Sequence, residues 1–168
     1  MVPEIKKILY ATDLSKNSSY AFYYAINIAR RFDAKIIILH AIEPIPIYIE
    51  AYAASVAEKI EKEDRQKTID HIQRLLQEFC KKVEAQMGSP CLLLVSKTLV
   101  RIGYPVEEIL KAADEEECEI IVLGTHGKGF LQQAFLGSVS SGVLHRSRKP
   151  VFVVPIPSEK DTIEWDEI

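Results

Sequence analysis

Short runs of apolar residues alternate with longer stretches of helical periodicity along this chain. Five runs predict strands buried on one or both faces, and they are Lys6–Ala11, Ala34–Ala41, Cys91–Thr98, Ile120–Leu123 and Val151–Val154. Strands that alternate with helical stretches are typical of a parallel sheet with helices on both faces. The pattern therefore predicts an α/β fold with right-handed crossovers between successive strands.

Four stretches between these runs predict helices, because their apolar residues recur at three- and four-residue spacings. They are Ser19–Phe32, the long charged stretch Glu58–Met87, a helix from Pro105 to about Glu116, and a helix that begins at Ser138. Pro105 suits the first turn of a helix, and Arg101–Pro105 is predicted as the turn before it. The predicted inner face of the first helix consists of Ala21, Phe22, Ala25, Ile28, Ala29 and Phe32.

Two segments stand outside this alternation. Glu43–Ala57 contains Pro44 and Pro46, which prevent regular structure, followed by several exposed apolar residues. We interpret this segment as a loop that folds over the core. The alternatives are that it forms a lid over a ligand or a surface that binds a partner. Residues 158–168 form an acidic C-terminal tail, so we expect one domain over residues 1–157.

Composition narrows the class of protein. The chain has 168 residues, the size of one domain, and 48% apolar content, which is enough for a single core. A net charge of −3 gives no general attraction to nucleic acid or anionic lipid. No apolar run reaches membrane-spanning length, and the N-terminus lacks the core of a signal peptide. We therefore expect a cytoplasmic protein that binds neither nucleic acid nor membranes.

The cysteines are three in number and widely spaced: Cys80, Cys91 and Cys118. Without a C-x-x-C pair, neither a zinc site nor a disulfide framework is expected. The prediction is three buried, small apolar side chains.

The fourth strand leads into a glycine-rich loop and then into a helix start. Gly124, Gly127 and Gly129 follow the strand, and Gly137 directly precedes Ser138. Glycines let a backbone approach phosphate oxygens closely, and the free N–H groups at a helix N-terminus favour an anion. This layout predicts a phosphate-binding site.

The spacing of these glycines excludes two common phosphate motifs, since neither G-x-x-x-x-G-K-[ST] nor G-x-G-x-x-G is present. The pattern that does fit is G-x-x-G, nine residues, G-[ST], which Gly124, Gly127, Gly137 and Ser138 meet without a gap. In this the chain resembles the ATP-binding branch of the universal stress protein family over about residues 5–156. A glycine-rich loop with no ligand is the alternative that the motif alone leaves open.

The resemblance implies a single doubly wound open sheet of five parallel strands in the order 3-2-1-4-5. The first and fourth strands are then neighbours at the topological switch, where open α/β sheets bind ligands. Asp13, at the end of the first strand, would accept a hydrogen bond from a ribose hydroxyl or hold Mg²⁺ near phosphate. The alternative is that Asp13 caps the turn before the first helix. The resemblance also implies that the backbone of Ala41 pairs with an adenine edge. His40 beside it is interpreted as a hydrogen-bonded structural residue.

These arguments predict a nucleotide site for ATP or AMP. Its residues are Ala11, Thr12, Asp13, Ala41, Leu123, Gly124, Thr125, His126, Gly127, Gly137, Ser138, Val139 and Ser140. The function that follows is a nucleotide-binding regulatory protein acting in stress response through its conformation or its choice of protein partner. A slow ATPase or phosphoryl transferase, with His126 as base, and a nucleotide-free dimeric scaffold stay open as alternatives.

Self-association is predicted from the last strand. Val151–Val154 is β-prone and, in the implied order, lies at the edge of the sheet, where unpaired N–H and C=O groups invite another chain. The family dimerises through this strand, so we expect a homodimer through Val151–Val154. A tail folded back over the edge is the alternative.

Overall fold

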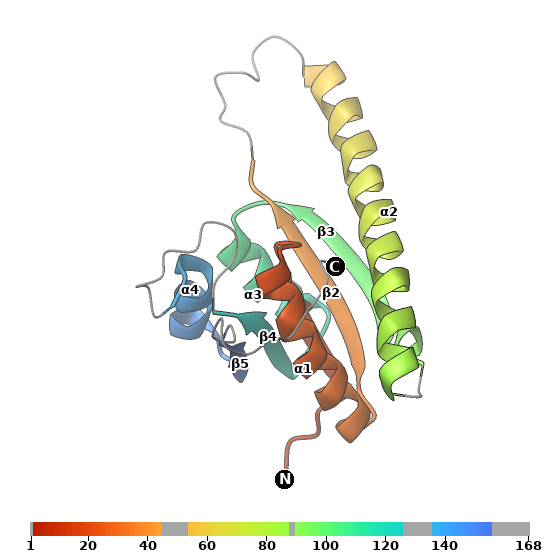
Figure 1. Cartoon of the computed structure of the whole chain (residues 1–168). Coiled ribbons are helices and arrows are strands. Elements are labelled where there is room, and N and C mark those ends of the chain that lie inside the picture. The colour runs from red at the N-terminus through yellow and green to blue at the C-terminus, as the bar shows by residue number, and fades with distance from the viewer. Residues whose placement is uncertain (1, 45–53, 88–89, 126–135, 156–168) are drawn as a thin grey trace.

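The fold is a twisted five-stranded parallel sheet, seen in a computed structural model that describes residues 2–44, 54–87, 90–125 and 136–155. The strand order is β3-β2-β1-β4-β5, which confirms the predicted order (Figure 1). The strands are β1 (Lys7–Ala11), β2 (Lys35–Ile42), β3 (Val95–Ile102), β4 (Ile120–Gly124) and β5 (Val151–Val154). His126, Gly127, residues 45–53 of the predicted loop and the tail 158–168 lie outside the described residues.

Helices cover both faces of this sheet, as predicted. α1 and α2 lie on one face, and α3 and α4 on the other (Figure 1). Their bounds are α1 (Lys16–Phe32), α2 (Ala54–Met87), α3 (Pro105–Glu115) and α4 (Ser138–Arg146). No helix within the described ranges is long and apolar enough to cross a bilayer.

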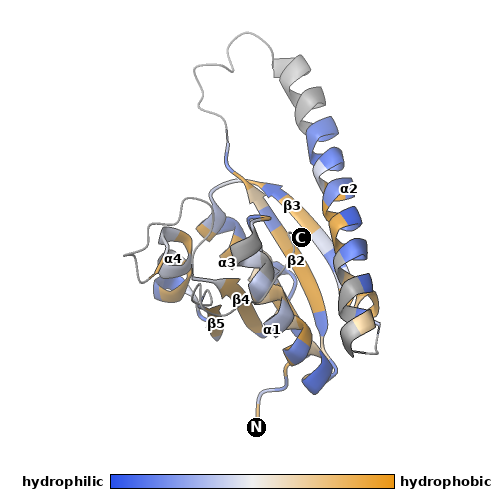
Figure 2. Ribbon diagram, in the orientation of Figure 1, coloured by the Kyte–Doolittle hydropathy of each residue, from blue (hydrophilic) through white to orange (hydrophobic). Residues whose placement is uncertain are grey.

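Side-chain alternation along each strand divides the core into two layers. Ile8 and Tyr10 of β1 pack with α1 and α2, whereas Leu9 and Ala11 pack with α3 and α4. All four side chains are buried, so β1 is a central strand covered on both faces. Figure 2 shows the resulting apolar sheet between helices that are polar on their outer sides.

The helix α1 begins one turn earlier than its apolar pattern predicts. The Ser15 hydroxyl accepts from the Ser18 N–H and caps the helix, which therefore starts at Lys16. Asp33 ends it in the left-handed conformation, with φ of 52°. Phe32, which the periodicity places on the inner face, is 53% exposed because it lies in this last turn.

The third strand lies four residues further on than predicted, so the boundary Cys91–Thr98 is wrong. Leu92–Leu94 forms a short 3-10 turn, η2, and Leu93 is 69% exposed. β3 is an edge strand that needs few buried side chains, so the continuous apolar run does not mark it. Arg101, predicted in a turn, lies in β3, and its guanidinium donates to Glu115 of α3 at 2.6 Å.

The prediction that no disulfide is present is also wrong. A disulfide joins Cys80, near the end of α2, to Cys91, just before η2, while Cys118 is a free thiol. The chain reverses direction between α2 and η2, which brings the two Cα atoms within 5.1 Å, inside the range that a disulfide spans. All three cysteines are buried, as predicted. Burial raises the pKa of the Cys118 thiol to about 11, so it stays neutral and unreactive.

Reduction of this disulfide is expected to lower the melting temperature. The bond closes a loop between residues 11 apart, and a loop of that size restricts the unfolded chain by about 2–3 kcal/mol. Calorimetry with and without a reductant should therefore differ by roughly 4–12 °C. A Cys80→Ala/Cys91→Ala double variant should melt at one temperature in both buffers. Three free thiols in the denatured, unreduced protein would refute the bond.

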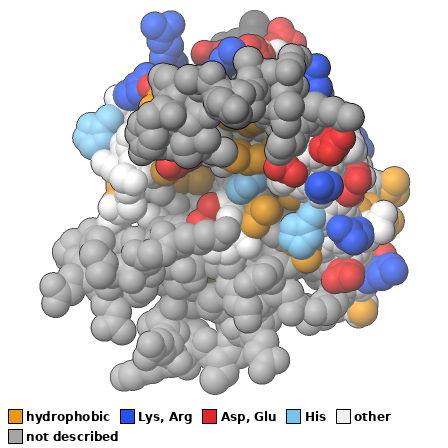
Figure 3. Space-filling model, turned by 90° about the horizontal axis from the view of Figure 1, so that it is seen from above, with side chains coloured by type: hydrophobic (Ala, Val, Ile, Leu, Met, Phe, Trp, Pro, Cys, Tyr) orange, Lys and Arg blue, Asp and Glu red, His pale blue; other side chains and the backbone are white. Residues whose placement is uncertain are grey.

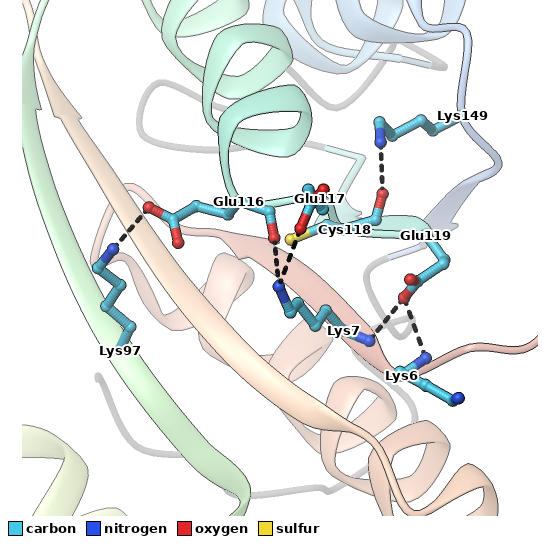
Figure 4. A network of polar contacts seen from close by, with 8 residues as sticks. All are labelled: Lys6, Lys7, Lys97, Glu116, Glu117, Cys118, Glu119 and Lys149. Carbon is cyan, nitrogen blue, oxygen red and sulfur yellow. Dashed lines mark hydrogen bonds and ion pairs between the residues drawn. The ribbon is translucent and has the colours of Figure 1, made fainter.

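Polar contacts fasten β1 to β4 at the amino-terminal end of the sheet (Figure 4). The Glu119 carboxylate accepts from the backbone N–H groups of Lys6 and Lys7 at 3.0 and 2.7 Å. The Glu119 N–H donates to the Lys7 carbonyl at 3.0 Å, and Lys149 donates to the Cys118 carbonyl. The bonds of Glu119 join β1 to β4 at this end. The opposite ends of these two strands bear the residues of the predicted site.

Candidate functional site

The carboxyl ends of β1 and β4 lie side by side at the centre of the sheet. The register pairs Tyr10 with Val122, so its continuation brings Thr12 level with Gly124 and Asp13 level with Thr125. The helix that follows β1, α1, lies on one face of the sheet, and the helix that follows β4, α4, lies on the other, as at the topological switch where open α/β sheets bind ligands. Acidic, histidine and apolar side chains are visible at this end of the molecule (Figure 3).

The turn after β1 presents Asp13 and is held by its own side chains. Asp13 Oδ1 accepts from the Ser15 N–H at 3.0 Å and from the Ser15 hydroxyl at 2.6 Å. Leu14 between them has a positive φ of 64°, and its N–H donates to Thr12 Oγ1. These two bonds show that Asp13 holds the turn, which is one of the two roles predicted for it. Its side chain is half-buried. A carboxylate has two oxygens, so this contact through Oδ1 is compatible with a ligand on Oδ2.

A buried polar group supports the turn from below. Thr12 and Ser18 are nearly inaccessible, and their hydroxyls lie 2.8 Å apart. The Tyr10 hydroxyl donates to the Ser18 carbonyl at 2.7 Å, and burial raises the pKa of this hydroxyl far above its usual value. It therefore stays protonated, as a donor to the Ser18 carbonyl, across the accessible pH range.

The start of α4 lies beside the end of β4. The Gly137 N–H donates to the Thr125 carbonyl at 2.7 Å, which joins the end of β4 to the helix. Gly137 is the N-cap, and no side chain caps the helix there. The first N–H groups of a helix have no acceptor within it, and those of Ser138, Val139 and Ser140 bond to no other backbone group of the described residues. Such groups favour an anion.

Ser140 has a structural role that the spacing did not predict. Its side chain is buried, and its hydroxyl donates to the Gly124 carbonyl at 2.6 Å. Because a hydroxyl carries one hydrogen, this side chain has none left for a phosphate oxygen. Only the backbone N–H of Ser140 is thus left for a ligand, whereas the side chain of Ser138 is exposed at the start of the helix.

The end of β2 contributes backbone groups. The Thr12 N–H donates to the Leu39 carbonyl, and the Gly103 N–H donates to the Ile42 carbonyl. Backbone groups alternate sides along a strand, so Leu39 and Ala41 face β1 while Ile42 faces β3. The N–H and C=O of Ala41 thus point toward β1 just beyond its last strand residue.

The structure brings most of the predicted site residues to one end of the sheet. They lie in three groups, which are Ala11–Asp13, Leu123–Thr125 with Gly137–Ser140, and Ala41. Ser15 and Ser18, which shape the turn, were not predicted as part of the site; two serines shortly after a strand-end Asp are a signal that could have found them. Within the described residues, no three side chains of His, Cys, Asp or Glu gather as a metal site would require.

Comparisons with known proteins agree with the fold and the motif. A profile of the universal stress protein family matches residues 4–155. The universal stress protein MJ0577 of Methanocaldococcus jannaschii is 32% identical over 158 residues, which cover 89% of this chain and 94% of that protein. A universal stress protein of Thermus aquaticus is 31% identical over 149 residues, with 89% and 98% covered.

Solved structures extend this agreement to three dimensions. The structure of MJ0577 matches with a TM-score of 0.68 at 29% identity and covers 94% of this chain and 100% of that one. The universal stress protein UspA from Lactobacillus plantarum has the same fold, with a TM-score of 0.69 at 23% identity over 91% of this chain and 99% of its own. The family profile spans nearly the whole described chain, and relatives above 30% identity cover about nine tenths of it. This chain belongs to the universal stress protein family.

Proposed function

We propose that this protein binds an adenine nucleotide, ATP or AMP, and acts as a regulatory member of its family in stress response. The observation that carries the proposal is the start of α4, where no described side chain caps the helix and where Gly137 bonds to Thr125, the residue that the strand register places level with Asp13. Free helix N–H groups next to a carboxylate match the phosphate and ribose of one nucleotide. A universal stress protein of the same fold, 24% identical with a TM-score of 0.58, has been solved in complex with cAMP.

Each part of the nucleotide has a proposed partner. Phosphate oxygens accept from the N–H groups of Ser138, Val139 and Ser140, and Gly137 leaves them room. A ribose hydroxyl donates to Asp13, and the adenine edge pairs with Ala41. The site is completed by backbone at Ala11, Thr12 and Leu123–Thr125, and by His126 and Gly127, which lie outside the described residues.

Mg²⁺ is the metal that we propose to accompany the phosphates. A single carboxylate is too few protein ligands for an independent site, and Asp13 Oδ1 already accepts from Ser15. Mg²⁺ keeps several waters and binds through one or two carboxylates plus phosphate oxygens. It would therefore arrive with ATP, held by the phosphates, with Asp13 as a ligand in place of its contact to ribose.

Mass analysis of the small molecules released from the purified, denatured protein tests the proposal directly. Retained ATP or AMP supports it, and a protein that neither retains nor binds either nucleotide is a scaffold. An assay for released inorganic phosphate then separates a binding protein from a slow ATPase. These two measurements decide among the three functions that the motif leaves open.

Replacing Asp13 with asparagine is expected to lower ATP affinity by about 1–3 kcal/mol while the melting temperature holds. Asparagine keeps an Oδ1 that accepts from Ser15, but an amide replaces the oxygen that would accept from ribose. Calorimetric titration should also show a smaller difference between ATP and its 2′-deoxy analogue than in the wild type.

Alanine at the same position separates the two contributions. Asp13→Ala removes the turn contact as well, so both affinity and melting temperature should fall. If Asp13 serves the turn alone, Asp13→Asn will bind ATP as the wild type does and only Asp13→Ala will be destabilised. That outcome would remove Asp13 from the site.

We also propose that the protein forms a homodimer through β5. The carbonyl groups of Pro150 and Val154 point toward β4, where they accept from the N–H groups of Ile121 and Thr125. By alternation, the N–H and C=O groups of Val151 and Val153 point to the open side of the sheet. Phe152 is 38% exposed and its ring lies 5.9 Å from that of Tyr24, so apolar surface adjoins this edge. A second copy can cover both by antiparallel pairing.

A further inference from the structure

The side chain of His40 ends the hydrogen-bond ladder between β1 and β2. Its Nδ1 lies 2.9 Å from the Thr12 carbonyl oxygen. A carbonyl oxygen only accepts, so Nδ1 carries the hydrogen and the neutral ring is the Nδ1–H tautomer. His40 is half-buried, and it follows Ile36 and Ile38 on the face of β2 that α1 and α2 cover.

This bond replaces a bond of the sheet. In a parallel ladder the Thr12 N–H donates to Leu39, as observed, and the Thr12 carbonyl would then accept from the Ala41 N–H. In the described structure the Thr12 carbonyl bonds to His40, and the bond from the Ala41 N–H to this carbonyl is not formed. The Ala41 N–H, which faces β1, is thereby left without its ladder partner.

We propose that His40 is a positioning residue that keeps the end of β2 open for a nucleobase. By holding the Thr12 carbonyl, the ring prevents β1 and β2 from pairing one residue further, and the Ala41 N–H stays available to an adenine nitrogen. The same bond anchors Thr12, whose neighbour Asp13 is the proposed ribose partner. The identity of the ligand rests on the proposed function. The effect of His40 on the pairing of β1 with β2 is argued only from the contacts of this chain.

The side-chain contacts of Thr12 do not duplicate this bond. Thr12 Oγ1 contacts Leu14 in the turn and Ser18 in α1, and neither residue belongs to β2. The bonds that tie Thr12 to β2 are its N–H to Leu39 and its carbonyl to His40. Removal of the His40 ring therefore leaves the Thr12 carbonyl able to turn toward the Ala41 N–H, which is its partner when a parallel ladder continues.

The first test measures hydrogen exchange of the Ala41 amide without any nucleotide. In His40→Ala the ladder should extend, so this amide should exchange more slowly than in the wild type. A loss of a merely stabilising contact would instead speed exchange around the strand end. Equal or faster exchange of Ala41 in the variant would overturn the proposal.

The second test compares two ligands by calorimetry. His40→Ala should weaken ATP binding about threefold to tenfold, the loss of one neutral hydrogen bond, and leave binding of inorganic tripolyphosphate unchanged. His40→Asn should restore ATP affinity, because its amide nitrogen occupies the place of Nδ1; His40→Gln, one bond longer, should not. An equal loss for both ligands, or no loss, would contradict the role assigned to His40.

His145 provides the matched control. Its Nδ1 also lies close to a backbone carbonyl, that of Ser141 at 2.8 Å, but on the exposed surface of α4. His145→Ala should change neither Ala41 exchange nor the ratio of the two affinities. If wild-type protein binds no ATP, the proposed function fails, and the exchange measurement still decides whether His40 arrests the ladder.

Discussion

Replacing Gly137 with valine is expected to weaken ATP binding at least tenfold while the protein stays folded. Gly137 precedes the free N–H groups of α4, and a branched side chain there enters the space proposed for phosphate. Charge-assisted hydrogen bonds contribute about 1.5–3 kcal/mol each, so the loss of one accounts for a factor of ten or more. Titration calorimetry at constant salt measures the change.

The backbone at Gly137 makes this substitution a test of space rather than of conformation. Its φ of −68° and ψ of 163° are accessible to any residue, so valine imposes no strain. Ser141→Val is the control: it adds a similar side chain one turn later, where the N–H already donates to the Gly137 carbonyl. Equal affinities for Gly137→Val and wild type would show that phosphate binds elsewhere.

The arrangement of the site could be predicted because it follows from topology. Once β1 and β4 are neighbours, Asp13 and Gly124 must meet at one end of the sheet, although more than a hundred residues separate them. Apolar runs mark the central strands well, since β1 and β4 are covered on both faces. The glycine spacing then identifies the start of α4, which lies beside the end of β4.

The predictions that failed concern contacts that local patterns do not encode. Leu92–Leu94 has the composition of a buried strand, yet the sheet edge needs only half of its side chains covered, and β3 starts later. The Cys80–Cys91 bond depends on how α2 returns to the sheet. Ser140 matches a phosphate donor by spacing, but its burial directs the hydroxyl to the Gly124 carbonyl.

For His40 the sequence predicts the kind of role but not the partner. A histidine at a strand end is predicted from sequence to be a hydrogen-bonded structural residue, and that is confirmed. What the sequence does not reveal is the acceptor. The acceptor is the carbonyl to which the Ala41 N–H would donate if the ladder continued, and the role proposed for His40 rests on this position.

Replacing Val153 with proline is expected to convert the protein from dimer to monomer. The Val153 N–H points away from β4, so proline removes a donor from the open edge and leaves the bonds of Pro150 and Val154 to β4 intact. Sedimentation at micromolar concentration measures the change, and circular dichroism checks that the sheet survives.

Two further variants identify the part of the strand that pairs. Val153→Ala keeps the backbone donor, so it should stay dimeric if main-chain pairing holds the copies together. Phe152→Ala removes exposed aromatic area but no outward donor, so it should weaken the dimer without abolishing it. A wild-type protein that sediments as a monomer, or a Val153→Pro variant that stays dimeric, would mean that the open edge of β5 is covered by something other than a second copy.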